Sequence, residues 1–507
     1  MVIFLKEGFS MKRTAIIIGA GIGGLSCAVR LLSQGFDVKL YEKNAYIGGK
    51  VNRFTHDGFT FDLTASILMM PSEYDEVFRM AQKNPEDYIE YMSLDPLYRV
   101  FYSDNTHYDF SSDMKKLSST LDSICPKDSA GFLRVLSEGL RKYTLADDYF
   151  LSKSFQSPGD FFNPVTLCNA LKMHTMSDTY SFISRHVKSE KLRQFLCFQA
   201  MYVGNSPYDS PNVYSLIPST SFYYGLRYIK GGMYSYILAL EKLILQLGGY
   251  IYKNSPIEEI VIKGNAAIGV IDTTGFEPSD VVVCNADFPY AVTNLLPNSI
   301  SLSKCTPEAV SQMKYSCSTF MLYLGINKKL PSLKVHNIFI GRNFKQNIKA
   351  AFKGKLPEAP SLYIYCPSQV DASMAPDGCE CLNVMLRVPN LLSDTPDWNE
   401  ATISYLEDIM LDALCSIEGL SDIRQHIIFK GHSTPELFRD EFNSYAGAAF
   451  GLSHNLLQTN YYRPQAKLPG INHLYFTGAS VHPGAGISIV LKSSRLATKE
   501  ILKDLNV

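Results

Sequence analysis

The strongest constraint on this chain is a run near its N-terminus that reads, in order, as strand, glycine loop, helix, strand and acidic residue. Residues 14–18 (TAIII) are continuously apolar, as in a buried parallel strand. Residues 24–34 carry apolar side chains at helical spacing, and residues 38–41 form a second apolar run that ends at Glu42. Between the first strand and the helix lie the glycines of a G-x-G-x-x-G motif, Gly19, Gly21 and Gly24. This order predicts a Rossmann-type α/β fold that binds a dinucleotide.

The spacing of these glycines has a physical reason. Gly19 permits the tight turn after the strand, Gly21 lets a pyrophosphate approach the backbone, and Gly24 lets the helix pack closely on the strand. The first turn of the helix offers free N–H groups and a positive potential to phosphates. Glu42 follows Gly24 by 18 residues, where a carboxylate accepts hydrogen bonds from an adenosine ribose.

A second glycine loop lies near the C-terminus. Residues 473–477 (HLYFT) predict a buried strand, residues 478–487 (GASVHPGAGI) a loop, and residues 488–505 a helix. The N–H groups at the start of such a helix stabilise negative charge. A ligand group that carries or gains negative charge is therefore expected at this loop.

Several segments resemble one known family. Gly48-Gly49-Lys50 resembles the G-G-[RK] extension of the FAD-containing amine oxidase and carotenoid desaturase superfamily, and residues 478–486 are similar to the G-A-S-x-H-P-G-x-G signature of bacterial carotenoid desaturases. Further similar segments are residues 59–62, 228–234, 285–287, 315–318 and 460–465. The resemblance covers nearly the whole chain from about residue 14, and it is strongest to the diapophytoene (dehydrosqualene) desaturases.

This resemblance implies a cofactor, a reaction and a set of contacts. The cofactor is FAD, and the reaction is the introduction of conjugated double bonds into a C30 carotenoid precursor by hydride transfer to the flavin. Ile257 is expected to contact the adenine through its backbone, with an ordinary core role as the alternative. The further FAD contacts that it implies are Gly49, Lys50, Gly478, Ala479, Gly486, Ile487 and Ser488.

Two departures from the family pattern leave other activities open. Asp62 is followed by Leu63-Thr64-Ala65, where the family has x-Gly-Pro, and Ser488 stands where the family has Pro. Both changes alter backbone freedom at positions expected near the flavin ring. The alternatives are an oxidase of a carotenoid terminal methyl group, or a non-redox isomerase or carrier that retains FAD. An amine oxidase, the further alternative, needs a polar cage.

Two residues are candidates for catalytic roles. By resemblance, the acid/base carboxylate of the family falls at Asp160, whose alternative role is that of a helix-capping residue. His482 lies in the flavin loop, where it either polarises the ring or holds the turn. Cysteine and histidine show no ligand spacing, so no metal site is expected.

The motifs divide the chain into two predicted domains. A discontinuous FAD-binding domain comprises residues 11–75, 225–300 and 465–507, and includes a predicted helix at 233–247 and a buried strand at 280–287. Residues 76–224 and 301–464 form an inserted, mixed α+β domain for the substrate and the membrane.

The remaining composition indicates the partners. Residues 195–226 carry one charge, at Asp209, and three prolines that exclude a continuous helix; they form either a buried core or the wall of an apolar tunnel for a polyene. Residues 149–176 form either a membrane-docking lobe or a solvated one. A net charge of -1 excludes the electrostatic pattern of a nucleic-acid binder. Scattered cysteines predict a reducing, cytoplasmic compartment. The two apolar segments and the family resemblance imply peripheral membrane association, and with it quinone or oxygen as the expected electron acceptor.

Overall fold

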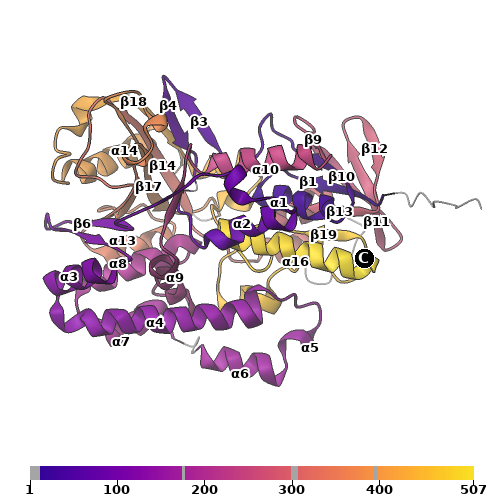
Figure 1. Cartoon of the computed structure of the whole chain (residues 1–507), viewed down its shortest axis with the longest axis horizontal. Coiled ribbons are helices and arrows are strands. Elements are labelled where there is room, and N and C mark those ends of the chain that lie inside the picture. The colour runs from indigo at the N-terminus through magenta and orange to yellow at the C-terminus, as the bar shows by residue number, and fades with distance from the viewer. Residues whose placement is uncertain (1–11, 65, 174–176, 298–305, 393–396, 507) are drawn as a thin grey trace, which may run out of the picture.

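Two sheets organise the molecule. The computed structural model describes residues 12–64, 66–173, 177–297, 306–392 and 397–506. A five-stranded sheet lies in the right half of Figure 1, and a seven-stranded sheet lies in the left half. The chain passes between the halves several times, so each half contains segments that are far apart in the sequence.

The five-stranded sheet is parallel and has the order β19-β13-β1-β2-β9. Ile17 of β1 packs with the helices on one face, whereas Ile16 and Ile18 pack with the antiparallel sheet β10-β11-β12 on the other. The strands are β1 (Thr14–Ile18), β2 (Asp37–Tyr41), β9 (Tyr250–Tyr252), β10 (Ile257–Lys263), β11 (Ala266–Asp272), β12 (Gly275–Pro278), β13 (Val281–Cys284) and β19 (Leu474–Phe476), and the helices are α1 (Ile22–Leu32), α10 (Tyr234–Gln246) and α16 (Ile487–Leu505). This arrangement confirms the predicted Rossmann-type α/β fold.

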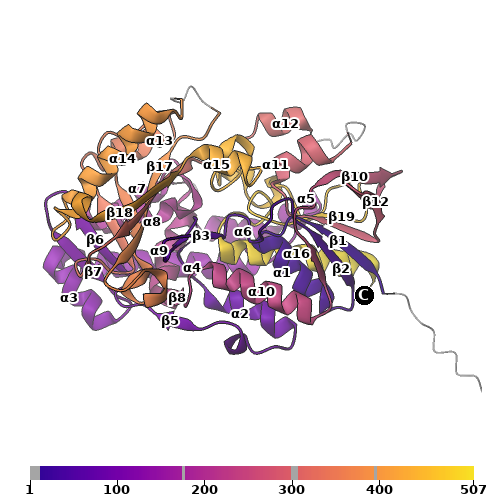
Figure 2. The ribbon, with the colours of Figure 1, turned by 90° about the horizontal axis from the view of Figure 1, so that it is seen from above.

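The seven-stranded sheet has the order β18-β14-β17-β16-β15-β6-β7. Its apolar face packs against α14 (Glu400–Cys415), which lies along the outer edge of the molecule in Figure 2. Its strands are β6 (Tyr98–Tyr102), β7 (His107–Phe110), β14 (Ser318–Ile326), β15 (His336–Ile340), β16 (Leu362–Tyr365), β17 (Glu380–Val388) and β18 (Ile427–Ser433). The opposite face of this sheet is turned toward the interior of the molecule.

Further helices complete the molecule, many of them in the left and lower parts of Figure 1. They include α2 (Pro71–Met80), α3 (Met114–Ile124), α4 (Ser129–Ala146), α5 (Pro158–Phe161), α6 (Pro164–Lys172), α7 (Thr179–His186), α8 (Glu190–Ala200), α9 (Leu216–Tyr224), α13 (Phe344–Ala351) and α15 (Pro435–Asp440). The segment 195–226 is divided between α8, two short turns and α9, as its prolines predict. No helix among the described residues is both long and apolar enough to cross a bilayer.

One hairpin differs from the predicted division of the chain. The strands β3 (Arg53–His56) and β4 (Phe59–Asp62) fall within the segment 11–75, which the sequence assigns to the FAD-binding domain. Their aromatic side chains pack instead against the seven-stranded sheet, where Phe59 and Phe61 join Met321 and Tyr323 in one buried cluster. Burial of these rings fastens the N-terminal segment to the other half of the molecule.

Candidate functional site

A cavity of about 520 Å³ is lined by residues from both halves of the molecule. Loops of the five-stranded sheet line one part of it, and α9 and the interior face of the seven-stranded sheet line another. It brings together nearly all of the predicted FAD contacts, namely Gly19, Gly21, Glu42, Gly49, Lys50, Ile257, Gly478, Ala479, Gly486, Ile487 and Ser488. Gly24 is the exception, because it packs beneath the loop.

The first glycine loop is shaped by close contacts that exclude side chains. A Cβ atom at position 24 would lie 2.1 Å from the carbonyl oxygen of Gly19, which is the close packing predicted for Gly24. A Cβ atom at position 21 would lie 2.8 Å from Nδ2 of Asn285, which itself donates a hydrogen bond to the Gly19 carbonyl at 3.2 Å. Gly21 is the N-cap of α1 and supplies no side-chain cap, so the N–H groups of the first turn stay free to face the cavity.

Glu42 is held in a fixed orientation at the edge of the cavity. One carboxylate oxygen accepts a hydrogen bond from the Ala20 N–H at 2.8 Å, and the other accepts from the Asn44 N–H at 3.0 Å. Burial raises the pKa of Glu42 above its usual value. Ser255 and Ile257 line the cavity near this carboxylate, which places β10 beside the position predicted for the adenosine.

Lys50 places a positive charge in the cavity. Its ammonium group donates to the carbonyl oxygens of Ala448, at 3.3 Å, and Ala449, at 3.1 Å. Burial lowers the pKa of Lys50 to about 8, against the smaller opposing effect of the Asp287 carboxylate. No ion pair to Lys50 occurs among the described residues, so its charge has room for an anionic partner.

The second glycine loop leads into α16. Gly478, Gly484 and Gly486 have φ angles of 128°, 138° and 109°, a backbone conformation that favours glycine. Helix α16 begins at Ile487 without a side-chain cap, so its first N–H groups also face the cavity. Two uncapped helix N-termini and one lysine therefore converge on the same space, and all three stabilise negative charge.

Buried polar side chains that are distant in sequence hold this second loop. Arg463 donates to the carbonyl oxygens of Gln458, Leu452, Ala479 and Val481 at 3.1, 3.2, 2.6 and 3.3 Å. His454 accepts a hydrogen bond from the Ala485 N–H at 3.1 Å. Arg463 lies in the segment 460–465, which the sequence singles out only through its resemblance to the family. No local sequence pattern predicts the role of His454, because its partner lies 31 residues away.

The other part of the cavity is mostly apolar. Residues of the segment 195–226 that line it are Tyr202, Val203, Pro211, Val213, Tyr214, Leu216, Ile217 and Thr220. Further apolar lining residues come from other segments, namely Met69, Met70, Phe150, Leu151 and Met173. Other members of the same segment, among them Phe195 and Phe198, are fully buried in the core beneath it. The segment 195–226 therefore contributes residues both to the buried core and to the lining of the cavity.

Comparisons with known proteins give the family. A model of the family described as "Flavin containing amine oxidoreductase" matches residues 22–502. A 4,4'-diapophytoene desaturase (4,4'-diaponeurosporene-forming) of Staphylococcus haemolyticus is 39% identical over 493 residues, which cover 96% of this chain and 98% of the relative. Its counterpart in Staphylococcus aureus strain N315 is 37% identical, again over 96% of this chain and 98% of the relative. This chain belongs to the diapophytoene desaturase family.

Solved structures share the fold of this desaturase-family chain at low sequence identity. An oxidoreductase from Methanosarcina mazei aligns with a TM-score of 0.67 at 16% identity, over 97% of this chain and all of the other. A putrescine oxidase aligns with a TM-score of 0.65 at 11% identity, over 98% of this chain and all of the other. These TM-scores show a common fold. The family match identifies FAD as the cofactor of this desaturase-family protein.

The chain fits FAD by its own geometry. The cavity offers two uncapped helix N-termini, an unpaired lysine, and a carboxylate at the end of β2. Thr477, which lines the cavity next to the second glycine loop, has a buried hydroxyl with no hydrogen-bond partner. Dinucleotide phosphates, the ribose and the flavin ring are acceptors and donors that complete such a set.

The two sites that depart from the family pattern lie in the cavity. Thr64, which stands where the family has glycine, lines it and donates to the carbonyl oxygen of Lys50 at 2.5 Å, so its side chain adds a hydrogen bond to the lysine loop. Ser488 lines it in the first turn of α16, where its hydroxyl lies 3.9 Å from the sulfur of Met70. Ala65 lies outside the described residues.

The two catalytic candidates take structural positions. Asp160 is exposed, does not line the cavity, and forms a capping box with Ser157, whose N–H donates to its carboxylate at 2.7 Å. His482 is buried behind the loop, and Nε2 lies 3.1 and 3.0 Å from the carbonyl oxygens of Phe150 and Lys153. Burial lowers the pKa of His482 to about 4, so the ring is neutral and donates to these carbonyls. Both positions match the structural alternatives, capping for Asp160 and turn support for His482.

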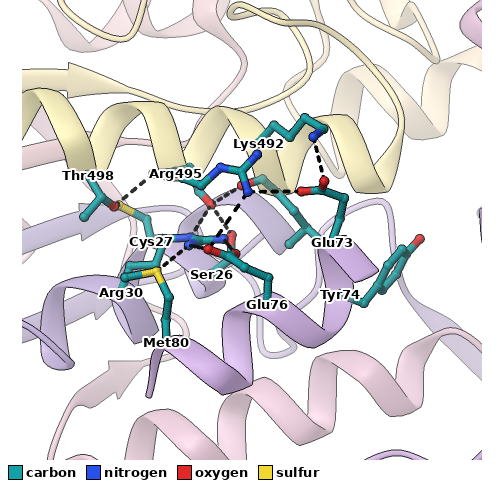
Figure 3. Close-up of polar contacts among 12 residues, drawn as sticks. Ser26, Cys27, Arg30, Glu73, Tyr74, Glu76, Met80, Lys492, Arg495 and Thr498 are labelled. Atoms are coloured by element: carbon teal, nitrogen blue, oxygen red, sulfur yellow. Dashed lines mark hydrogen bonds and ion pairs between the residues drawn. The ribbon is translucent and has the colours of Figure 1, made fainter. Parts of the chain in front are cut away.

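A buried ion network joins the helices that carry the two glycine loops (Figure 3). Arg30 of α1 is 1% exposed and pairs with Glu76 of α2. Lys492 of α16 is also 1% exposed and pairs with Glu73 at 2.6 Å and with Asp147 at 2.8 Å. Asp147 begins the turn that carries Phe150 and Leu151 into the cavity wall. The network therefore holds α1, α16 and the cavity-lining segment with Phe150 and Leu151 in fixed positions relative to one another.

Proposed function

We propose that this protein is the FAD-dependent desaturase that converts 4,4'-diapophytoene into 4,4'-diaponeurosporene, the product in the name of its relatives. The observation that carries the proposal is the single cavity, in which a dinucleotide cradle and an apolar tunnel share one space. A long hydrocarbon has no group that forms hydrogen bonds, so its site must be apolar and elongated. When bound, FAD accepts the hydride that leaves the substrate.

The chain's own residues position the substrate and exclude water. Ile217 and Leu216 of α9 line the cavity together with Met69 and Phe150, so a polyene bound there would lie among apolar side chains. The acidic residues among the described lining are Glu42, Asp287 and Glu441, and all belong to the cofactor part. The apolar part thus holds no described carboxylate that would take up the proton, and charge in the transition state is left to the conjugated system of the substrate.

A turnover experiment tests the function. Purified protein with FAD is mixed with 4,4'-diapophytoene in liposomes, and the absorption spectrum is followed in time. New polyene bands at longer wavelength that require FAD support the proposal. Oxygenated products would favour the terminal-methyl oxidase, and a geometric isomer without further conjugation would favour the isomerase or carrier. We further propose that residues 11–75, 225–300 and 465–507 form the FAD-binding domain, except for the β3–β4 hairpin, which packs on the seven-stranded sheet.

We also propose that the protein docks on a membrane through an apolar patch around α6. Its exposed side chains are Phe162, Val165, Leu167, Leu171, Leu457 and Tyr462, and Leu171 and Leu457 are 74% and 75% exposed. Aromatic contacts join its two segments, since the ring centroids of Phe162 and Tyr462 lie 6.5 Å apart. Leu456, the neighbour of Leu457, is 46% exposed and also lines the cavity, so this patch adjoins the cavity.

Liposome co-sedimentation tests the docking patch. L171E/L457E is expected to abolish most of the bound fraction, because two carboxylates cannot be buried in the acyl boundary. L245E/I428E is the matched control, since Leu245 and Ile428 are each 57% exposed on other elements. Equal loss in both variants would contradict a specific patch.

A further inference from the structure

Two polar side chains interrupt the apolar wall of the tunnel on the seven-stranded sheet. Thr319 of β14 and Arg387 of β17 are directly opposite each other in the antiparallel register, so their side chains point to the same face. Met385 lies two residues before Arg387 and pairs with Tyr363 of β16, and both also line the cavity. The four residues form one surface of the cavity, polar at the Thr319–Arg387 end.

The charge of Arg387 is buried without a counterion. The side chain is 7% exposed, and its guanidinium donates to the carbonyl oxygen of Met201 at 3.0 Å and lies 5.4 Å from the ring centroid of Phe198. Nε has no hydrogen-bond partner, and no ion pair to Arg387 occurs among the described residues. Thr319 is 2% exposed, and its hydroxyl is also without a partner.

Two other buried arginines of this chain have the hydrogen-bond acceptors that Arg387 lacks. Arg463 is satisfied by four carbonyl oxygens, and Arg30 by the carboxylate of Glu76. An uncompensated guanidinium is costly in an apolar interior, and a hydrocarbon substrate offers it no acceptor. An oxygen atom of a bound ligand would supply the missing acceptor.

We propose that Arg387 and Thr319 form a subsite for the carbonyl oxygen of a ligand that is otherwise a long apolar isoprenoid. Two sources share this chemistry: a prenylated quinone, and a polyene that is already oxidised at an end carbon. The subsite rests on the proposed function, because that function makes the rest of the tunnel apolar. Tyr202 and Tyr363, whose ring centroids lie 6.4 Å apart, provide aromatic walls beside it.

The quinone source would also complete the redox balance. One desaturation would remove a hydride and a proton from the substrate; a bound FAD would take the hydride, and the proton would be released to solvent. Reduction of a quinone to a quinol takes that hydride and one proton from solvent, which returns FAD to its oxidised form. The electrons and protons therefore balance with no further reactant.

Binding measurements on the FAD-loaded protein test the subsite with three probes, namely menaquinone-2, an acyclic C30 polyene aldehyde, and squalene as the hydrocarbon. R387M keeps the apolar stem and removes the charge, and T319V keeps the shape and removes the hydroxyl. We expect R387M to weaken binding of a carbonyl probe about tenfold and T319V a few-fold, with squalene affinity changed by less than about twofold. The probe that is affected identifies the source.

Two outcomes would overturn the subsite. One is that neither carbonyl probe binds the unaltered protein more tightly than squalene does. The other is that T319V has no effect and R387M weakens all three probes equally, which is the result for an arginine that only supports the Met201 carbonyl. If R387M does not fold, the test rests on T319V alone, and the subsite is overturned if T319V does not weaken binding of either carbonyl probe. Failure of the proposed function is distinguishable, since it would appear as absent turnover of 4,4'-diapophytoene by the unaltered protein.

Discussion

Lys50 combines a buried charge with a role at the cofactor, so it gives a pH-dependent prediction. Burial holds its pKa at about 8, so the ammonium is charged below that pH and neutral above it. Affinity for the anionic FAD is therefore expected to fall as the pH rises through about 8. In K50M the affinity is expected to be about tenfold lower at pH 7, or roughly 1.4 kcal/mol, and nearly independent of pH.

Titration of FAD against the apoprotein between pH 6.5 and 9.5, followed by flavin fluorescence, measures this effect. K353M is the control, because Lys353 is exposed and does not line the cavity. A flat affinity profile for the unaltered protein, or the same slope in K50M, would remove Lys50 from the cofactor site.

Alanine substitutions at two glycines of the first loop are expected to have different effects, one mainly on stability and the other mainly on FAD binding. G24A is expected to destabilise the apoprotein by about 1–3 kcal/mol, because its Cβ would lie 2.1 Å from a backbone oxygen that cannot move away. G21A meets only the flexible side chain of Asn285 and is expected to weaken FAD binding with a smaller loss of apoprotein stability. Thermal unfolding of both apoproteins, together with FAD titration, tests the contrast. Equal unfolding temperatures for the two variants would contradict it.

At the scale of elements, the ion network of Lys492 is expected to hold α16 against α2 and against the turn that begins at Asp147. K492M leaves Asp147 without its cation and leaves Glu73 with Arg495 alone, at 3.4 Å, so we expect a loss of about 3 kcal/mol in the free energy of unfolding, the low end for a broken buried pair. K230M is the control, since Lys230 and its partner Glu90 are 57% and 63% exposed. Chemical denaturation measures both, and a K492M loss below 1 kcal/mol would show that the network is energetically neutral.

Elements built from local patterns were predictable from the sequence, and those that depend on distant partners were not. The strand β1 and the helix α16 follow from continuous apolar runs and helical spacing, and both fall within two residues of their predicted bounds. The packing of Phe59 and Phe61 on the seven-stranded sheet depends on partners more than 250 residues away. The same holds for His454, whose contact with the glycine loop no local pattern encodes. The family resemblance made Asp160 a candidate acid/base residue. Its local sequence, Ser157 to Asp160, also predicts the capping box in which Asp160 lies.

A substitution on the cavity-lining face of α9 is expected to affect turnover of the polyene without affecting FAD binding. Ile217 is 5% exposed and lines the apolar part of the cavity. I217W adds a large ring to this wall, so turnover of a long polyene is expected to fall at least tenfold while FAD affinity changes by less than about twofold. A matched loss of FAD binding would show that the two parts of the cavity are not separate.

On the scale of the whole molecule, one cavity couples segments from both ends of the chain, and its two ligands should report different parts of it. Hydrogen exchange on the apoprotein with FAD is expected to slow together at residues 19–24, 48–51 and 478–490, because those loops line the cofactor part. Squalene is expected to slow exchange at residues 145–151 and 202–220 instead. Because a ligand at 100 times its Kd stabilises the folded state by about 2.7 kcal/mol, the protection is large enough to resolve. Protection of the glycine loops by squalene alone would mean that the polyene occupies the cofactor cradle, and the assignment of the two halves would then fail.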